Sequence, residues 1–259
     1  MKYAQLIIGL LIGTALGGAV VSSETQHLHL AGSSAGSADD EHIRQVVRDT
    51  ISGDGKLLLD SIQKYQSDQQ QASVEEASKA LQDPGVRDAI FNDDSLAYIG
   101  NPNGRHVVAQ FFDYNCPVCH MQNQIFFDLM KQDPELKIVL HEFPIFGPDS
   151  DENTKIGFGV NKFYPKKYFA FYQKMMSGRG HDLTNEKVDG YLKELGFDVA
   201  KLRTYAKSDE ANEKLQKARD LSQKLKLQGT PSIVIGDSIV PHAMQKEEIE
   251  SHFTQAAPE

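Results

Sequence analysis

The chain has 259 residues, of which 40% are hydrophobic and 24% charged, a composition typical of a globular protein with one sizeable core and some appendages. Its net charge of −9 and the lack of a basic cluster exclude nucleic acid as an expected partner. Its two cysteines, Cys116 and Cys119, can build neither a disulfide framework nor a four-cysteine zinc site, which leaves a redox pair, a haem anchor or a two-thiolate metal site.

The first 23 residues have the pattern of an export segment. A single lysine precedes an almost wholly apolar run over residues 3–21, and small residues close this run near Val21. A basic start, an apolar stretch and small residues indicate a signal peptide, whereas an apolar run close to the ~20 residues that cross a bilayer indicates a membrane anchor. We therefore expect an exported protein, and both cleavage and retention of this segment stay open.

Residues 24–38 are small, polar and rich in glycine and serine, which predicts a flexible linker. The following residues, 39–92, predict a helical arm. Apolar residues at helical spacing mark its first helix: Ile43, Val46, Val47 and Ile51. A second helix is expected from Leu57, and a third from Ser73, because Ser73 and Glu76 match the capping-box pattern.

The apolar stripes of this arm are narrow, and short helices that bury so little surface are marginal on their own. We therefore expect the arm to pack on a partner chain, so that the protein is a homo-oligomer through residues 39–92. A loosely tethered spacer is the alternative interpretation.

A different pattern begins after residue 96 and predicts a mixed α/β domain. Residues 106–114 and 137–145 are rich in β-branched and aromatic residues and predict two buried strands, with a helix over 117–131 between them. A Gly236-Asp237 turn within residues 230–241 predicts a hairpin, which a final helix follows. Between the second strand and the hairpin, helices are expected over residues 153–162, 165–176, 185–195, 199–206 and 209–225.

Cys116 follows the first of these strands and precedes a helix that begins at Pro117. Proline suits the first helical position because its φ is fixed and its missing N–H needs no partner there. We expect the Cys116 sulfur to lie over the open N–H groups of the helix N-terminus, which favour thiolate and lower cysteine pKa values to ~3.5–7.5. Cys119, one turn into the helix, would then resolve the mixed disulfide between Cys116 and a substrate.

The string C-x-x-C-H has two further interpretations. With His120 it matches a c-type haem attachment site, but the strand before Cys116 is unlike the helical surroundings of small cytochromes. His120 is otherwise expected to be an exposed residue of the first helical turn. The alternative function is a copper-binding carrier or chaperone that uses the same two thiolates, although no other ligand-type residues cluster beside them.

Three segments together resemble the exported DsbA-like thiol–disulfide oxidoreductases of bacteria, especially members with an N-terminal helical arm: GNPNGRHVVAQFFDYNCPVC, HEFPIFGPDS and GTPSIVIGDSIVP. The resemblance implies an α/β protein with a thioredoxin fold over residues 93–257 and a helical domain inserted over about 151–225. It implies a periplasmic protein, soluble or tethered to the inner membrane by residues 3–21, that forms or isomerises disulfides in other exported proteins. A membrane redox partner of DsbB or DsbD type, no cofactor and no metal are expected.

The same resemblance assigns residues to the site. It makes Cys116 and Cys119 the catalytic pair, and it implies that a cis-proline loop, here Thr230-Pro231, faces them and binds the substrate strand. With threonine before this proline, the chain resembles the disulfide isomerases and the oligomeric members that have an arm.

Gln110 departs from the family pattern. It stands six residues before Cys116, where many members have a buried carboxylate that accepts the proton of the second cysteine. An amide cannot take up a proton at ordinary pH. Fast resolution by Cys119 would then need water or another base. Glu142 and His141 on the next strand are the candidates, and a structural role is the alternative for each.

Val118 departs from the pattern as well. DsbA has histidine at this position, which helps to stabilise its thiolate, whereas valine offers no charge. Pro117, Val118 and Gln110 are therefore expected to tune the redox pair. We expect it to be less oxidising than DsbA, with a potential within ~−120 to −270 mV.

Overall fold

The computed structural model describes residues 35–255 of the chain. The export segment predicted over residues 1–23 and most of the linker predicted over 24–38 lie outside these residues. None of the helices in the described range is both long and apolar enough to cross a bilayer.

Contacts divide the chain into two compact units, of which the first ends at Leu58 and the second begins at Leu59. Residues 59–92 therefore belong to the same unit as the domain that we predicted to begin at residue 93. The first unit contains helix α1 (Ala35–Gly53) and the start of helix α2 (Gly55–Ala80).

Helix α2 runs without interruption through Ser73, so the prediction of a new helix at this residue is wrong. No proline or glycine interrupts the chain between residues 56 and 80. The Ser73 hydroxyl does not cap a helix but donates to the carbonyl oxygen of Lys226 at 2.6 Å. Ser73, whose spacing to Glu76 resembles a capping box, thus makes a tertiary contact and caps no helix.

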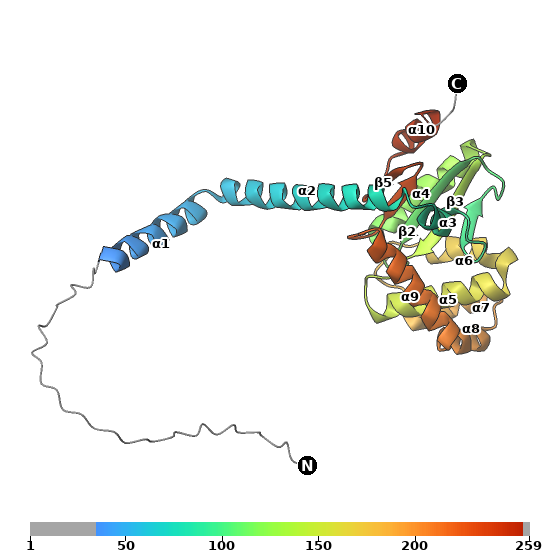
Figure 1. Ribbon diagram of the computed structural model, residues 1–259. Coiled ribbons are helices and arrows are strands. Elements are labelled where there is room, and N and C mark those ends of the chain that lie inside the picture. Colours follow the sequence, from blue (N-terminus) through green and yellow to red (C-terminus); the bar gives the residue numbers. More distant parts are fainter. Residues whose placement is uncertain (1–34, 256–259) are drawn as a thin grey trace, which may run out of the picture. The chain divides into compact units, whose positions relative to one another are not determined.

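The core of the second unit is a five-stranded sheet with the strand order β1-β3-β2-β4-β5 (Figure 1). Strands β2 and β3 are parallel, and the other neighbouring pairs are antiparallel. The strands are β1 (Ala97–Gly100), β2 (His106–Phe112), β3 (Leu136–Glu142), β4 (Ser232–Ile235) and β5 (Ser238–Val240). Strand β1 was not predicted, because four residues carry too little periodicity to be recognised.

Side chains alternate between the two faces of the sheet because the strand period is two. On one face Val108 and Phe112 of β2 pack into the larger core cluster, to which helix α4 (Pro117–Gln132) contributes. On the other face Phe111 packs beside the C-terminal part of α2 and helix α3 (Pro84–Phe91). Helix α10 (Lys246–Gln255) contacts α4.

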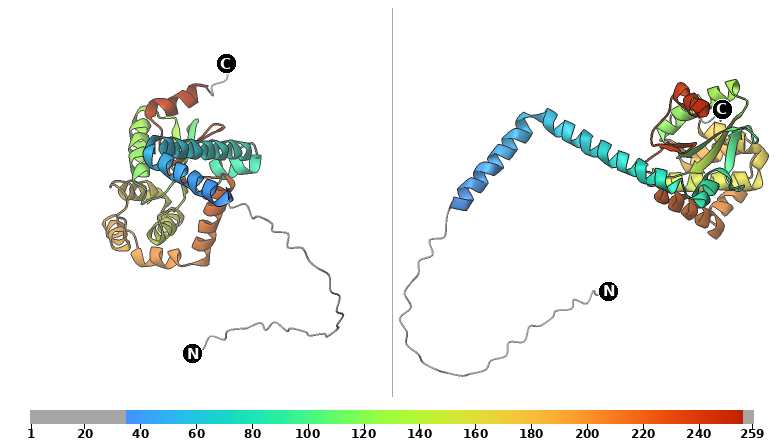
Figure 2. Two further views of the ribbon diagram at one scale, coloured as in Figure 1. Left: turned by 90° about the vertical axis from the view of Figure 1, so that its left-hand side faces the viewer. Right: turned by 45° about the horizontal axis from the view of Figure 1, so that its top comes forward.

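Helices inserted between β3 and β4 gather beside the sheet (Figures 1 and 2). Side-chain caps set the start of three of them, since Thr184, Asp198 and Ser208 each accept a hydrogen bond from a backbone N–H three residues later. The inserted helices are α5 (Pro148–Phe163), the 3₁₀ turn η1 (Pro165–Lys167), α6 (Tyr168–Met175), α7 (Asn185–Glu194), α8 (Val199–Ala206) and α9 (Asp209–Lys224).

Candidate active site

Cys116 lies in the connection between the end of β2 and the start of α4. It is the N-cap residue of α4, with φ −84° and ψ 115°, and Pro117 occupies the first helical position, as predicted. The backbone N–H of Cys119 donates to Cys116 Sγ at 3.4 Å. The local sequence therefore places the sulfur at the open N–H groups of the helix.

The two thiols differ strongly in acidity. A hydrogen bond from the Cys119 side chain, assisted by the backbone N–H groups of Cys119 and Val118, lowers the pKa of Cys116 to about 6. Burial raises the pKa of Cys119, whose side chain is fully buried, well above its ordinary value. Near neutral pH the reduced pair therefore consists of one thiolate, at Cys116, and one thiol, at Cys119.

This asymmetry gives a prediction for the reduced protein. We expect the rate of Cys116 alkylation by iodoacetamide to follow the thiolate and to reach half its maximum near pH 6, well below the ~8.5 of an ordinary thiol. The pKa of Cys116 is lower in the folded than in the unfolded protein. Ionisation of Cys116 therefore adds to the folding stability of the reduced protein, and the full contribution is present at pH values above the unfolded pKa. This contribution is lost as the pH falls through about 6.

Mass spectrometry of the alkylated protein over a series of pH values measures the midpoint. The matched control is Cys119→Ala, which removes the hydrogen bond that lowers the Cys116 pKa most and should move the midpoint upward. A midpoint near that of an ordinary thiol in the unmodified sequence would contradict the assignment.

The loop before β4 faces the cysteine pair. The Thr230-Pro231 bond is cis, as the resemblance implies. Cys116 Sγ lies 3.3 Å from the carbonyl oxygen of Thr230, although the two residues lie 114 positions apart in the sequence. The hydroxyl of Thr230 is buried and has no hydrogen-bond partner within the described residues.

Gln110 is completely buried on the face of the sheet that carries the larger core cluster, between Val108 and Phe112. The Tyr172 hydroxyl donates to its Oε1 at 3.3 Å, whereas Nε2 has no partner in the part of the chain that the structure covers. Burial raises the pKa of Tyr172, whose hydroxyl also interacts electrostatically with Cys119. The surroundings of Cys119 thus contain an amide and a phenol rather than a carboxylate.

His141 and Glu142, the two predicted substitutes for this carboxylate, point to opposite faces of the sheet. The His141 ring stacks on Phe111 at 4.4 Å, Nε2 lies 2.9 Å from the carbonyl oxygen of Ile90, and burial lowers its pKa to about 4. This face is turned away from the cluster that contains Cys119, so His141 cannot serve that thiol.

Glu142 shares the face of Gln110. It is buried and accepts a hydrogen bond from the Tyr168 hydroxyl at 3.1 Å, and Tyr168 lies 3.1 Å from the hydroxyl of Tyr114. Burial raises the pKa of Glu142 to about 7, so this carboxyl group changes its protonation near neutral pH. Of the two predicted substitutes, Glu142 is the one with suitable chemistry on the suitable face.

The prediction of an exposed His120 is wrong. The side chain is buried, with Nδ1 lying 3.0 Å from the carbonyl oxygen of Gly178 and Nε2 2.7 Å from that of Tyr114. The segment around Gly178 covers the first turn of α4, which no local pattern in the sequence reveals. Both ring nitrogens face protein carbonyls, so neither is directed at a metal or haem iron.

We expect His120→Ala to destabilise the protein by about 1–3 kcal/mol, because it removes the imidazole donor from the buried carbonyl oxygen of Tyr114, and an unpartnered buried acceptor costs ~1–3 kcal/mol. Urea unfolding of the reduced protein measures the loss. Met121→Ala is the control, since the neighbouring side chain is 61% exposed and its removal should change the stability by less than ~0.5 kcal/mol. Equal effects of the two substitutions would show that the His120 contacts do not stabilise the fold.

Two polar residues that the sequence motifs did not single out hold the connection between β2 and α4. The Asp113 carboxylate accepts hydrogen bonds from the backbone N–H groups of Ile145 and Phe146, at 2.7 and 3.1 Å. Asn115 accepts from the N–H of Leu183 through Oδ1 at 3.1 Å. Polar residues directly after a buried strand were the available signal, because buried polar groups need partners.

Gly180 allows the segment that covers α4 to approach the cysteine motif. Its φ is +75°, and a Cβ atom there would lie 2.9 Å from the backbone nitrogen of Pro117. Only glycine meets both requirements without strain. Within residues 35–255, no group of three or more His, Cys, Asp or Glu side chains converges on a common point at which a metal ion could bind.

A family model described as thioredoxin matches residues 92–253, which include the whole sheet, both cysteines and the cis-proline loop. The chain belongs to the thioredoxin family. The predicted thioredoxin fold with an inserted helical domain is confirmed.

Thioredoxin-family relatives are consistent with the predicted chemistry. A Bacillus anthracis protein named probable disulfide bond formation protein D is 26% identical over 151 residues, which are 54% of this chain and 70% of that protein. The catalytic domain of Proteus mirabilis ScsC has a TM-score of 0.61 and 28% identity, covering 69% of this chain and 97% of that domain. A thioredoxin-like oxidoreductase from Silicibacter pomeroyi DSS-3 has a TM-score of 0.61 and 31% identity, covering 66% and 96%. The prediction of a DsbA-like thiol–disulfide oxidoreductase is confirmed.

Proposed function

We propose that this thioredoxin-family protein forms or isomerises disulfides in other exported proteins through Cys116 and Cys119. The Cys116 thiolate attacks one sulfur of a substrate disulfide, and the other substrate sulfur leaves as a thiolate. Cys119 loses its proton and attacks Cys116 Sγ, which releases the second substrate thiolate and leaves the pair oxidised. The reverse sequence oxidises a substrate dithiol and reduces the pair.

The observation that carries this proposal is the position of Cys116 Sγ. It is the cap of a helix, its pKa is lowered to about 6, and it lies 3.3 Å from the carbonyl oxygen of Thr230. In the proposed mechanism the backbone of Thr230 binds the substrate strand, and Pro231 offers no N–H that would compete for the same strand. Pro117, Val118 and Gln110 tune the potential of the pair.

The reactivation of scrambled ribonuclease by the purified protein tests this function. We expect reactivation that depends on Cys116. Strong Cu(I) binding without reactivation would support a copper carrier instead. Thiol trapping in cells then separates the two directions of exchange, since a mostly oxidised pair indicates an oxidase and a mostly reduced pair an isomerase.

The place of action follows from the predicted export segment. We propose that the protein works in the periplasm, soluble or tethered to the inner membrane by residues 3–21, and that a membrane partner of DsbB or DsbD type resets its redox state. The periplasm is oxidising, so disulfides form and persist there and a C-x-x-C pair can exchange them. This match between motif and compartment supports the proposal.

We also propose that the protein is a homo-oligomer through the helical arm of residues 39–92. Helix α1 has an exposed apolar stripe: Ile43, Val46, Val47 and Ile51 are each between 50% and 58% exposed. The stripe repeats at the spacing of one helix face, and such a face is stable in water when another surface covers it. A second copy of the same helix supplies a matching apolar surface.

We expect Val47→Asp to convert the oligomer into monomers, since a charge in the middle of the stripe would be buried without a partner. Light scattering coupled to size-exclusion chromatography measures the mass. Gln45→Asp is the control, because it introduces the same charge on the opposite side of α1. A monomeric parent protein, or an oligomer that survives Val47→Asp, would contradict the arm as an interface.

A further inference from the structure

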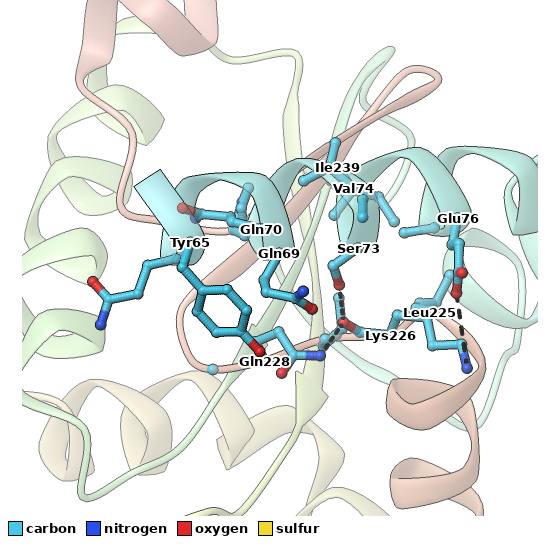
Figure 3. A pocket seen from close by; sticks show the side chains of 16 residues that line it. Tyr65, Gln69, Gln70, Ser73, Val74, Glu76, Leu225, Lys226, Gln228 and Ile239 are labelled. Atoms are coloured by element: carbon cyan, nitrogen blue, oxygen red, sulfur yellow. Dashed lines mark hydrogen bonds and ion pairs between the residues drawn. The ribbon is translucent and has the colours of Figure 1, made fainter. Parts of the chain in front are cut away.

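A groove of about 500 Å³ lies between helix α2 and the segment that leads into the cis-proline loop (Figure 3). This volume falls within the ~300–1,000 Å³ of typical ligand sites. Tyr65, Gln69 and Ser73, at helical spacing on α2, line one wall, and residues 225–229 line the other. In Figure 3 the side chains of Tyr65 and Gln69 extend from α2 toward Gln228.

The groove is continuous with the proposed substrate site. Gly229, which lines the groove, directly precedes Thr230, and the carbonyl oxygen of Thr230 lies 3.3 Å from Cys116 Sγ. A substrate sulfur that is bonded to Cys116 must therefore lie beside Thr230. An extended chain advances ~3.3 Å per residue, so the residues a few positions from the substrate cysteine reach the groove.

The chemistry of the lining matches a polypeptide backbone. Gln66, Gln69, Gln70 and Gln228 line the groove, and each glutamine amide offers both a donor and an acceptor, as a peptide group does. The charged lining residues Glu76 and Lys226 lie 3.9 Å apart and neutralise each other. The exposed ring of Tyr65 adds apolar contact area at a small cost in conformational entropy.

We propose that this groove binds an extended segment of the substrate polypeptide next to its reactive cysteine, chiefly through the substrate main chain. The groove thereby makes the protein select protein disulfides over small disulfides. The proposal rests on the proposed function, since it extends the substrate site at Thr230. Helix α2 is then part of the substrate site as well as part of the arm.

The test compares two substrates of the full-length protein, scrambled ribonuclease and glutathione disulfide. Tyr65→Ala and Gln69→Arg should each raise the KM for scrambled ribonuclease by about 5- to 20-fold, which corresponds to the loss of one or two good contacts. The rate with glutathione disulfide should stay within about twofold, because so small a substrate does not reach the groove. Gln71→Arg is the matched control, since this exposed glutamine of the same helix does not line the groove.

A Gln69→Arg protein that behaves like Gln71→Arg, or that loses activity equally with both substrates, would overturn the groove as a polypeptide site and leave the proposed function intact. A parent protein that exchanges disulfides with neither substrate would overturn the proposed function, and with it the role of the groove.

Discussion

Replacing Cys116 with serine is expected to abolish disulfide exchange, lowering kcat/KM by about 10³-fold or more, because a serine hydroxyl can neither ionise near neutral pH nor form a disulfide. Cys119 cannot take over the attack near neutral pH, since burial raises its pKa well above the usual range and keeps it a thiol. Scrambled-ribonuclease reactivation by the Cys116→Ser protein measures the loss. The control is Met121→Ala, which changes an exposed side chain of the same helix and leaves both thiols in place.

The companion substitution Cys119→Ser should give a different defect. Cys116 keeps its nucleophilic sulfur, so mixed disulfides with substrates form but are resolved slowly, and covalent complexes should accumulate on a non-reducing gel. Retention of more than about a tenth of the activity by Cys116→Ser, or complexes that form equally without Cys116, would contradict the assigned roles.

Gln110→Glu is expected to speed the resolving step by about 10- to 100-fold, because it supplies a general base where general acid–base catalysis contributes up to ~10²–10⁴-fold. The fold should tolerate it. Gln110 Nε2 has no partner among residues 35–255, and Tyr172 can donate to a carboxyl oxygen as it donates to Oε1, at 3.3 Å. Glutamate has nearly the same shape, so no cavity is created.

The resolving step is measured from the mixed disulfide of Cys116 with thionitrobenzoate, whose release by Cys119 changes the absorbance. In the parent protein the release rate should rise with pH through neutrality, because burial raises the Cys119 pKa and Glu142 ionises near pH 7. The Gln110→Glu protein should level off once the new carboxyl group has ionised. Gln110→Met, which fills the space without a base, is the control, and equal rates in both variants would exclude a proton-transfer role for position 110.

The local order of residues was enough to predict the reactive half of the site. A buried strand, then Cys116, then Pro117 at the first position of a helix determines where the sulfur lies, because strand and helix geometry and the open N–H groups act over a few residues. The helices of the insertion were predictable for the same reason. Caps such as Thr184 and Ser208 act on N–H groups three residues away.

Contacts between distant segments decided the remainder. The sequence alone could not predict that His120 is buried against the carbonyl of Gly178, or that Ser73 of α2 bonds to Lys226. These contacts depend on how whole elements pack, and packing of apolar surface is non-directional and sums over many residues.

The sequence by itself thus predicted a C-x-x-C redox pair at a helix start, and it showed that Gln110 cannot act as its base. The tertiary structure decided which neighbour remains available. Adjacent residues of a strand point to opposite faces, and the parallel register of β2 and β3 sets Glu142 on the face of Gln110 and His141 on the other. The same packing brought the carbonyl of Thr230 within 3.3 Å of Cys116 Sγ, a contact between residues 114 positions apart that no local pattern specifies.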